Sequence, residues 1–154
     1  NYDVCFVGGR ANNGFDEKYK IMMSHFREFK NSGLKCGIFV NKNLTHEQEN
    51  KILYNSKVAL NIHDAYQREL GLDTNERTFK ALGLTGVLVS DEVDQLKNFF
   101  PEVKTTNDPK QMVKFVKEYV NMDESELNSI KEKNRKMILE NHTYTHRALK
   151  LLEK

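Results

Sequence analysis

The chain has little of what would assign it to a specialised class of protein. Its 154 residues include no tryptophan, two prolines and two cysteines, and the formal net charge is only +2. Lys and Arg alternate with Asp and Glu along the predicted helices, so this mild balance argues against a nucleic-acid partner. No apolar run approaches the roughly 18 residues that a membrane-spanning helix needs, so an integral membrane protein is not expected.

Two cysteines are too few for a disulfide framework. Cys5 and Cys36 both occupy apolar, strand-like runs, so we expect them to behave as small buried hydrophobes and not as a bridge. Because no secretory signal is recognisable, we expect a reduced, cytoplasmic protein. Peripheral association with a membrane is expected, if at all, of the full-length protein only.

The composition that remains is that of a soluble globular domain. Hydrophobic residues make up 38% and charged residues 30% of a chain of 18.0 kDa. This length suffices to bury a core without disulfide or metal support, so we expect a single domain over residues 1–154. The sequence opens on a strand-like run without an initiator methionine, which predicts a fragment of a longer protein.

Strand-like runs alternate with helical patterns along the chain. The runs cover residues 2–7, 35–40, 57–62, 86–90 and about 102–105. Such alternation predicts an α/β domain, specifically a Rossmann-like, doubly wound parallel sheet of about five strands with helices on both faces. Ligands of such sheets bind beyond the carboxyl ends of the strands. The loops 8–15, 63–74 and 90–94 are therefore the candidate binding loops.

Helix signals support the same fold. Tyr19, Met22, Phe26 and Phe29 recur at spacings of three and four, which places them on one helical face. Caps are expected at Thr45, Asp108 and Asp123. Helical patterns separate the predicted strands, and three helices are expected after the last strand, of which the final one is short and carries Leu149 and Leu152.

Two glycines follow the first predicted strand directly. Gly8 and Gly9 allow a tight turn close to a ligand, and Arg10 adds a permanent positive charge, so this turn is a candidate diphosphate clamp. With Gly14, the spacing does not match the dinucleotide fingerprint, which argues against a nicotinamide enzyme. The alternative is that both glycines only form the turn between strand and helix.

A polar segment precedes the helix that leads into the fourth predicted strand. Its candidate ligand-binding residues are Asn75, Glu76, Arg77 and Thr78. A helix start presents unpaired N–H groups and the positive end of the helix dipole, so this segment is suited to hold a phosphate. We expect Asp73 or Thr74 to cap the helix. The alternative role for Arg77 is a simple ion pair with a neighbouring carboxylate.

Histidines occur at two further points of interest. His63 ends the third strand, where it can donate to a phosphate or sugar hydroxyl, or be satisfied by a backbone carbonyl. Asp64 beside it raises the alternative of a phospho-accepting receiver domain, but no acidic pair follows the first strand to hold magnesium. His142 and His146 lack a nearby cysteine or carboxylate cluster, so no metal site is predicted.

Three segments of the chain resemble one family of enzymes. The matching residues are Asn75, Arg77, Phe79, Ala81, Gly86 and Asp91, then Asp108 and Pro109, and finally His142, Thr143, Tyr144 and Arg147. Together they resemble the C-terminal half of bacterial GT-B glycosyltransferases, in the group that includes spore-maturation-like proteins. The resemblance covers most of the chain from about residue 58 to residue 147.

The resemblance implies a nucleotide-sugar-binding domain, one half of a GT-B fold, whose partner is a missing N-terminal acceptor-binding domain. An Arg or backbone amides near Arg77 would hold the diphosphate of the donor, a nucleotide-diphosphate sugar that serves as co-substrate without a further cofactor. Because no Asp-x-Asp element is present, transfer is expected to be metal-independent. The closing segment, from His142 to Arg147, would run toward the missing domain.

One feature departs from that family. Members commonly carry two glutamates, separated by seven residues, that hold the donor ribose, whereas this chain has Leu72 and Lys80 at those positions. A carboxylate accepts hydrogen bonds from ribose hydroxyls and an ammonium group cannot, so Glu69 or Glu76 would have to replace the contact. Glu76 and Lys80 stand four residues apart on one helix, so a surface ion pair is an equal alternative.

Two hypotheses follow. In the first, this domain binds the donor of a glycosyltransferase that acts only as the full-length protein, with the turns around Arg10 and Arg77 converging to form a cationic cradle for the diphosphate. In the second, it is a non-catalytic Rossmann-like binding or interaction module derived from such an enzyme. A carboxylate from Glu69 or Glu76 inside the cleft would favour the first hypothesis, and exposure of both would favour the second.

Overall fold

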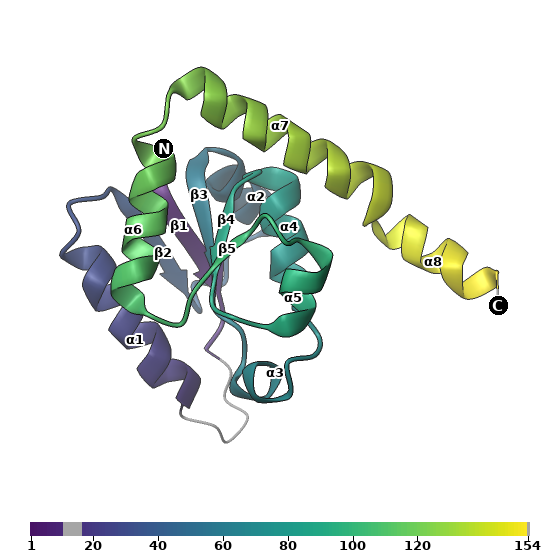
Figure 1. The fold of residues 1–154 in the computed structure, drawn as a ribbon, viewed down its shortest axis with the longest axis horizontal. Helices are drawn as coiled ribbons and strands as arrows, with labels where there is room; N and C mark the ends of the chain where they lie inside the picture. Colours follow the sequence, from purple (N-terminus) through teal and green to yellow (C-terminus); the bar gives the residue numbers. More distant parts are fainter. Residues whose placement is uncertain (11–16, 154) are drawn as a thin grey trace.

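Five parallel strands form one sheet with helices on both of its faces (Figure 1). This computed structural model describes residues 1–10 and 17–153. The strands are β1 (Tyr2–Gly8), β2 (Cys36–Val40), β3 (Ser56–Asn61), β4 (Leu88–Ser90) and β5 (Lys104–Thr105). The helices are α1 (Glu17–Lys30), α2 (His46–Tyr54), α3 (Ala65–Leu70), α4 (Glu76–Leu84), α5 (Asp94–Phe99), α6 (Pro109–Val120), α7 (Glu124–Asn141) and α8 (Tyr144–Leu152). The predicted α/β, Rossmann-like fold class is confirmed.

The strand order creates a topological switch point within the sheet. The order is β2-β1-β3-β4-β5, so the chain moves outward from β1 on one side to β2 and then builds the other side from β3 onward. Loops that leave β1 and β3 therefore run in opposite directions and separate at the carboxyl edge. In doubly wound sheets of this order, ligands bind at that switch point.

Strand β1, which lies between β2 and β3, is buried on both faces, and this explains its almost continuous apolar sequence. Val4 and Phe6 of β1 face one core, while Cys5 and Val7 face the other. The first core is completed by residues of α1 and α6, and the second by residues of α2, α4, α5 and α7. Strands of parallel sheets covered by helices on both sides have this composition.

Several predicted boundaries are wrong by a few residues. The fourth and fifth predicted strands shorten to β4 and β5, and the third begins one residue earlier, at Ser56. The loop expected over 63–74 contains the short helix α3, which begins where the Asp64 N–H donates to the Gln67 side chain. Gly71, in the left-handed conformation with φ of 68°, ends it. A single helical turn flanked by polar residues gives little periodicity to predict from.

The last two helices extend away from the sheet. Helix α7 packs along α4. Helix α8 follows α7 and projects from the body of the domain (Figure 1). Across residues 1–10 and 17–153, none of the helices has the length and apolar character that a membrane crossing would require. Cys5 and Cys36 are both free thiols, as predicted.

Candidate functional site

The carboxyl ends of β1 and β3 meet the start of α4, so the turn at Gly8 and the segment around Arg77 lie together. The Arg77 guanidinium passes so close to Gly8 that a Cβ there would lie 2.5 Å from Nη2. A glycine at position 8 therefore leaves space for the Arg77 guanidinium, in addition to forming the turn between strand and helix. The two segments adjoin at the switch point of the sheet.

Arg77 is held in place by groups that leave its charge without a close counter-ion. Its Nη1 donates to Asn61 Oδ1 over 3.1 Å, and its Cζ lies 5.2 Å from the centre of the Phe6 ring. Burial lowers the pKa of the guanidinium, although more distant carboxylates, Asp64 first among them, oppose the shift. Within the described part of the chain, no carboxylate forms an ion pair with Arg77. The alternative of a simple ion pair is not observed there.

Asn61 is the organising residue that the sequence analysis missed. It is fully buried on β3, and its amide nitrogen donates to Asn75 Oδ1 over 2.9 Å and to Thr78 Oγ1 over 3.0 Å. Its oxygen accepts from Arg77 and from the Asn75 side chain. Asn61 thereby joins the end of β3 to the first turn of α4. A carboxamide inside an otherwise apolar strand was the available signal.

The helix α4 is capped by Asn75 and not, as predicted, by Asp73 or Thr74. The Asn75 side chain accepts from the Thr78 N–H over 3.3 Å. Asp73 adopts a left-handed backbone with φ of 66°, and the Thr74 hydroxyl is used by other partners, so neither is available as the cap. Thr78 is buried, with its hydroxyl turned toward the protein interior.

His63 lies beneath the site in a buried polar network. Its Nδ1 is 2.7 Å from Asp91 Oδ1, and its Nε2 is 2.9 Å from Thr74 Oγ1. The same carboxylate accepts from the His63 backbone N–H and from the Ser90 hydroxyl, and it pairs with Arg68. His63 is satisfied by side chains and not by a carbonyl of the backbone. It is fully buried, so a direct contact with a ligand remains a prediction.

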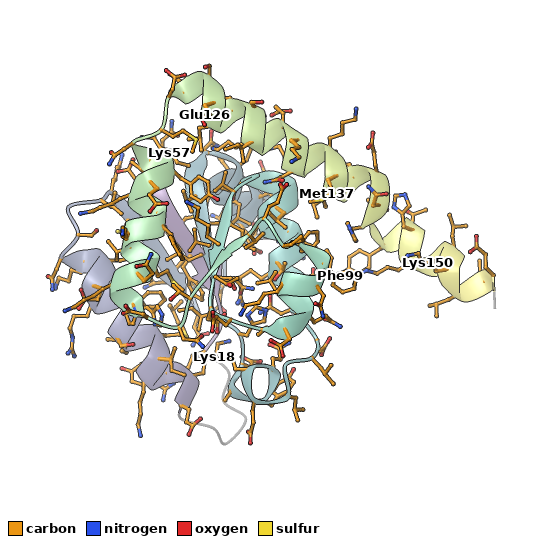
Figure 2. All side chains as sticks on the ribbon, in the orientation of Figure 1. Lys18, Lys57, Phe99, Glu126, Met137 and Lys150 are labelled. Carbon is orange, nitrogen blue, oxygen red and sulfur yellow. The ribbon has the colours of Figure 1, made fainter. Side chains whose placement is uncertain are left out.

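A second ion pair fixes the start of α3 to α1. Lys18 of α1, labelled in Figure 2, is almost fully buried. It pairs with Asp64. The ion pair with Lys18 explains why an aspartate stands at position 64, so no phospho-accepting role of the receiver-domain kind is needed to explain it. It also brings the first helix against the loop that follows β3.

The two arginines of the proposed cradle have different partners. Arg10 is exposed, its N–H donates to Asn41 Oδ1 over 3.0 Å, and its guanidinium carbon lies 4.2 Å from the centre of the Tyr19 ring. Arg77 lies over Phe6 instead. The turns therefore adjoin, while each guanidinium is held on its own aromatic ring. The remainder of the loop, including Gly14, lies outside the described residues.

A cavity of about 210 Å³ opens between the ends of β1 and β2 and the start of α2. The polar and glycine residues in its wall are Gly8, Gly9, Asn41, Lys42, Asn43 and Glu49. Glu49 Oε2 is 2.8 Å from Lys80 Nζ, so the partner of Lys80 is Glu49 and not Glu76. Glu69 and Glu76 are both exposed, and Glu76 raises the pKa of the Tyr144 hydroxyl on α8. A carboxylate thus reaches this cavity from α2, a helix that was predicted but not assigned to the site.

Comparison with known proteins gives one match. A family described as glycosyl transferase-like matches residues 7–153, which is nearly the whole chain. No curated protein and no solved structure matches it. The matched region contains every residue assigned above to the switch point except Phe6.

Proposed function

We propose a donor-binding function for this chain, which belongs to the glycosyl transferase-like family. In this proposal the switch point between β1 and β3 binds the diphosphate of a nucleotide sugar, whose sugar is then transferred to an acceptor. The observation that carries the proposal is the Arg77 guanidinium, held against Gly8 at the switch point. A cation fixed at this place in a doubly wound sheet suits a phosphorylated ligand.

Arg77 would act on the charge that builds up as the donor breaks. When the bond between sugar and diphosphate breaks, negative charge accumulates on the leaving nucleoside diphosphate. A guanidinium already oriented by Asn61 and Phe6 stabilises that charge without reorganising, and its partial burial strengthens the interaction. The first N–H groups of α4 that Asn75 leaves open add the positive end of the helix dipole. This arrangement requires no metal ion or further cofactor.

The ribose would be held by Glu49. One of its carboxylate oxygens pairs with Lys80, and the other remains to accept hydrogen bonds from hydroxyl groups in the adjoining cavity. In the GT-B enzymes that the sequence resembles, a glutamate stands at the place of Lys80. Here the lysine would instead position a glutamate from α2. Gly9 and Asn41 in the same wall leave room for the nucleoside.

The activity would belong to a two-domain protein of the bacterial GT-B type. The acceptor would bind on an N-terminal domain across an interdomain cleft, and much of the rate of transfer comes from holding the two substrates together. We therefore expect the isolated chain to bind nucleotide weakly and to transfer no sugar. Detectable transfer by this chain alone would contradict that expectation.

A second candidate function is a non-catalytic binding or interaction module. The observation in its favour is that Glu69 and Glu76, the two carboxylates expected to replace the ribose contact, are both exposed. Such a module would have retained the fold and lost the donor. It would then bind no nucleoside diphosphate at the switch point.

Titration of the chain with UDP, GDP and ADP, followed through backbone amide shifts, separates the two. The donor-binding function predicts saturable shifts at Gly8, Gly9, Asn41 and Arg77 with at least one of the three nucleotides. Arg77→Ala should weaken that binding about tenfold to a hundredfold, the usual effect of losing a charge-assisted hydrogen bond. Arg27→Ala, which removes an exposed arginine from the last turn of α1, is the matched control. An absence of shifts at these residues would favour the module.

A further inference from the structure

A second polar cavity lies where the end of α7 and the start of α8 approach α4 and α5. Its volume is about 310 Å³, and it shares no lining residue with the cavity beside Gly8. The residues that matter for its chemistry are Gln95, Phe99, His142, His146, Arg147 and Lys150. Figure 2 shows Phe99 at the edge of the body that faces α8, and Lys150 on α8 itself.

Positive charge is concentrated in this cavity. Arg147 and Lys150 each bring a permanent charge, against one carboxylate in the wall, that of Asp73. Over residues 1–10 and 17–153, neither cation forms an ion pair with a carboxylate. Burial lowers the pKa of His142, and the neighbouring Arg147, Lys150 and His146 lower it further. Each of these effects indicates an unneutralised positive potential that an anion would relieve.

Two of the basic residues in this cavity, Arg147 and His142, have a structural role that must be distinguished from ligand binding. The Arg147 guanidinium carbon lies 4.4 Å from the centre of the Phe79 ring, and His142 packs against Phe79, Phe99 and Phe100. These contacts attach α8 to the domain, and Thr143 and His146 form its capping box. Lys150 makes no comparable contact among the described residues. Lys150 is exposed, so its charge is accessible to a ligand in the cavity.

The opposite wall offers an apolar surface and a neutral donor. Phe99 is 50% exposed and presents an apolar ring in this wall. Gln95 accepts the Thr74 N–H through Oε1 over 2.6 Å, which fixes the carboxamide in place. Its amide nitrogen has no hydrogen-bond partner among the residues that the structure describes. A ligand with an anionic group and an apolar group would satisfy both walls at once.

We propose that this cavity is a second ligand site, which binds a small phosphate monoester carrying an apolar group. The two permanent cations favour a phosphate, with a charge of about −1.5 to −2 at neutral pH, over a carboxylate with a single charge. The phosphate would lie against Lys150 and His146, with the apolar group on Phe99. This site goes beyond the donor function, because none of the residues of the switch point takes part in it.

Phenyl phosphate is the probe, with inorganic phosphate and benzoate as comparisons. Amide shifts should saturate at Gln95 and Lys150, with phenyl phosphate binding more tightly than either comparison because only it carries both groups. The pKa of His142, followed through its ring protons, should rise when the anion binds. The charged groups that face this imidazole are Arg147, Lys150 and His146.

Variants separate binding from the attachment of α8. Lys150→Gln should weaken phenyl phosphate about tenfold or more, as expected for one charge-assisted contact, and Lys150→Arg should retain most of the affinity. Lys136→Gln, an equal charge change on the exposed side of α7, should have no effect. Arg77→Ala should also leave this site unchanged, so failure of the donor function would not affect the outcome.

Three titration results would each overturn the proposal. They are an absence of shifts at Gln95 and Lys150 with about 10 mM phenyl phosphate, equal affinity in Lys150→Gln, or equal weakening by Lys136→Gln. Loss of helical content in Lys150→Gln, measured by far-ultraviolet circular dichroism, would instead assign Lys150 to the packing of α8. That result would also remove the site.

Discussion

Replacing Gly8 by alanine should disturb the switch point through one identifiable contact. The new Cβ would lie 2.5 Å from Nη2 and 2.7 Å from Cζ of Arg77, closer than unbonded atoms can approach. Gly8 is not among the glycines with positive φ, so alanine suits the backbone there. The guanidinium must therefore move, because it is the mobile end of a flexible side chain.

The expected cost follows from what Arg77 gives up. Leaving Asn61 loses a charge-assisted hydrogen bond worth about 1.5–3 kcal/mol, and leaving the Phe6 ring loses roughly 0.5–1 kcal/mol. Two effects offset part of this loss. Water hydrates the displaced guanidinium again, and alanine lowers the conformational entropy of the unfolded chain, which favours folding. We expect a net destabilisation of about 1–2 kcal/mol. Because the cation is no longer oriented, affinity for a nucleoside diphosphate should fall about tenfold to a hundredfold.

Urea unfolding and titration with UDP measure the two effects. For unfolding, Gly9→Ala is the matched control, because among the described residues a Cβ at that position meets only Asn41 Oδ1, at 3.4 Å. For UDP affinity the control is Arg27→Ala, which changes an exposed residue of α1. In the Arg77→Ala background, Gly8→Ala should have almost no further effect on stability or on affinity, since the two changes remove the same contact. Equal destabilisation by Gly8→Ala and Gly9→Ala, or an undiminished effect of Gly8→Ala without Arg77, would refute the reasoning.

Three further predictions concern single side chains. Glu49→Gln should reduce the preference for UDP over its 2′-deoxy analogue, because a carboxylate is a better acceptor for ribose hydroxyls than a carboxamide. Calorimetric titration would measure the two affinities, and an unchanged ratio of affinities would show that Glu49 does not contact the ribose. Burial lowers the pKa of His25 below its usual 6.5, so the unfolded chain binds more protons between the two values. Stability should therefore fall as the pH drops through that window, and His25→Leu should reduce the fall in urea unfolding between pH 7 and pH 5; an identical pH dependence would contradict this. Burial raises the pKa of Cys5 to about 11, so little of its thiol is ionised at pH 8. A thiol reagent at pH 8 should therefore modify the partly exposed Cys36 first, and peptide mass spectrometry would measure the order. Earlier modification of Cys5 would contradict its buried position.

The middle of the sheet was predictable because long runs of β1, β3 and β4 are buried. A run such as Val4 to Val7 is apolar at every position, and glycines or polar clusters bound it. The strand starts were less predictable, since β4 and β5 begin only where pairing begins, at Leu88 and Lys104, about two residues after the predicted starts. Helix α3 was missed because its six residues are too few to show a helical periodicity.

The site was predictable only in part. Gly8 and Arg77 were each identified from local sequence, as a turn glycine and as a cation at a helix start. Their direct contact depends on the strand order, which local sequence does not specify. The cap of α4 was misassigned because three adjacent residues can all cap a helix, and only tertiary partners remove Asp73 and Thr74 from the choice.

The residues that were missed act across long separations in the chain. The carboxamide of Asn61 stands out in its strand, but its partners Asn75 and Thr78 are 14 and 17 residues further along the chain and are not indicated by the sequence around it. Glu49 occurs on a surface helix, and nothing in its local sequence indicates that it will reach Lys80, 31 residues further along. A pairing of this kind is visible only once the sheet has brought α2 and α4 together.

A crystal structure of the chain with bound UDP would test the central claim most directly. The account predicts a phosphate oxygen within about 2.7–3.2 Å of the Arg77 guanidinium, next to Gly8 at the edge between β1 and β3. UDP bound elsewhere, with Arg77 still directed only at Asn61 and Phe6, would contradict it.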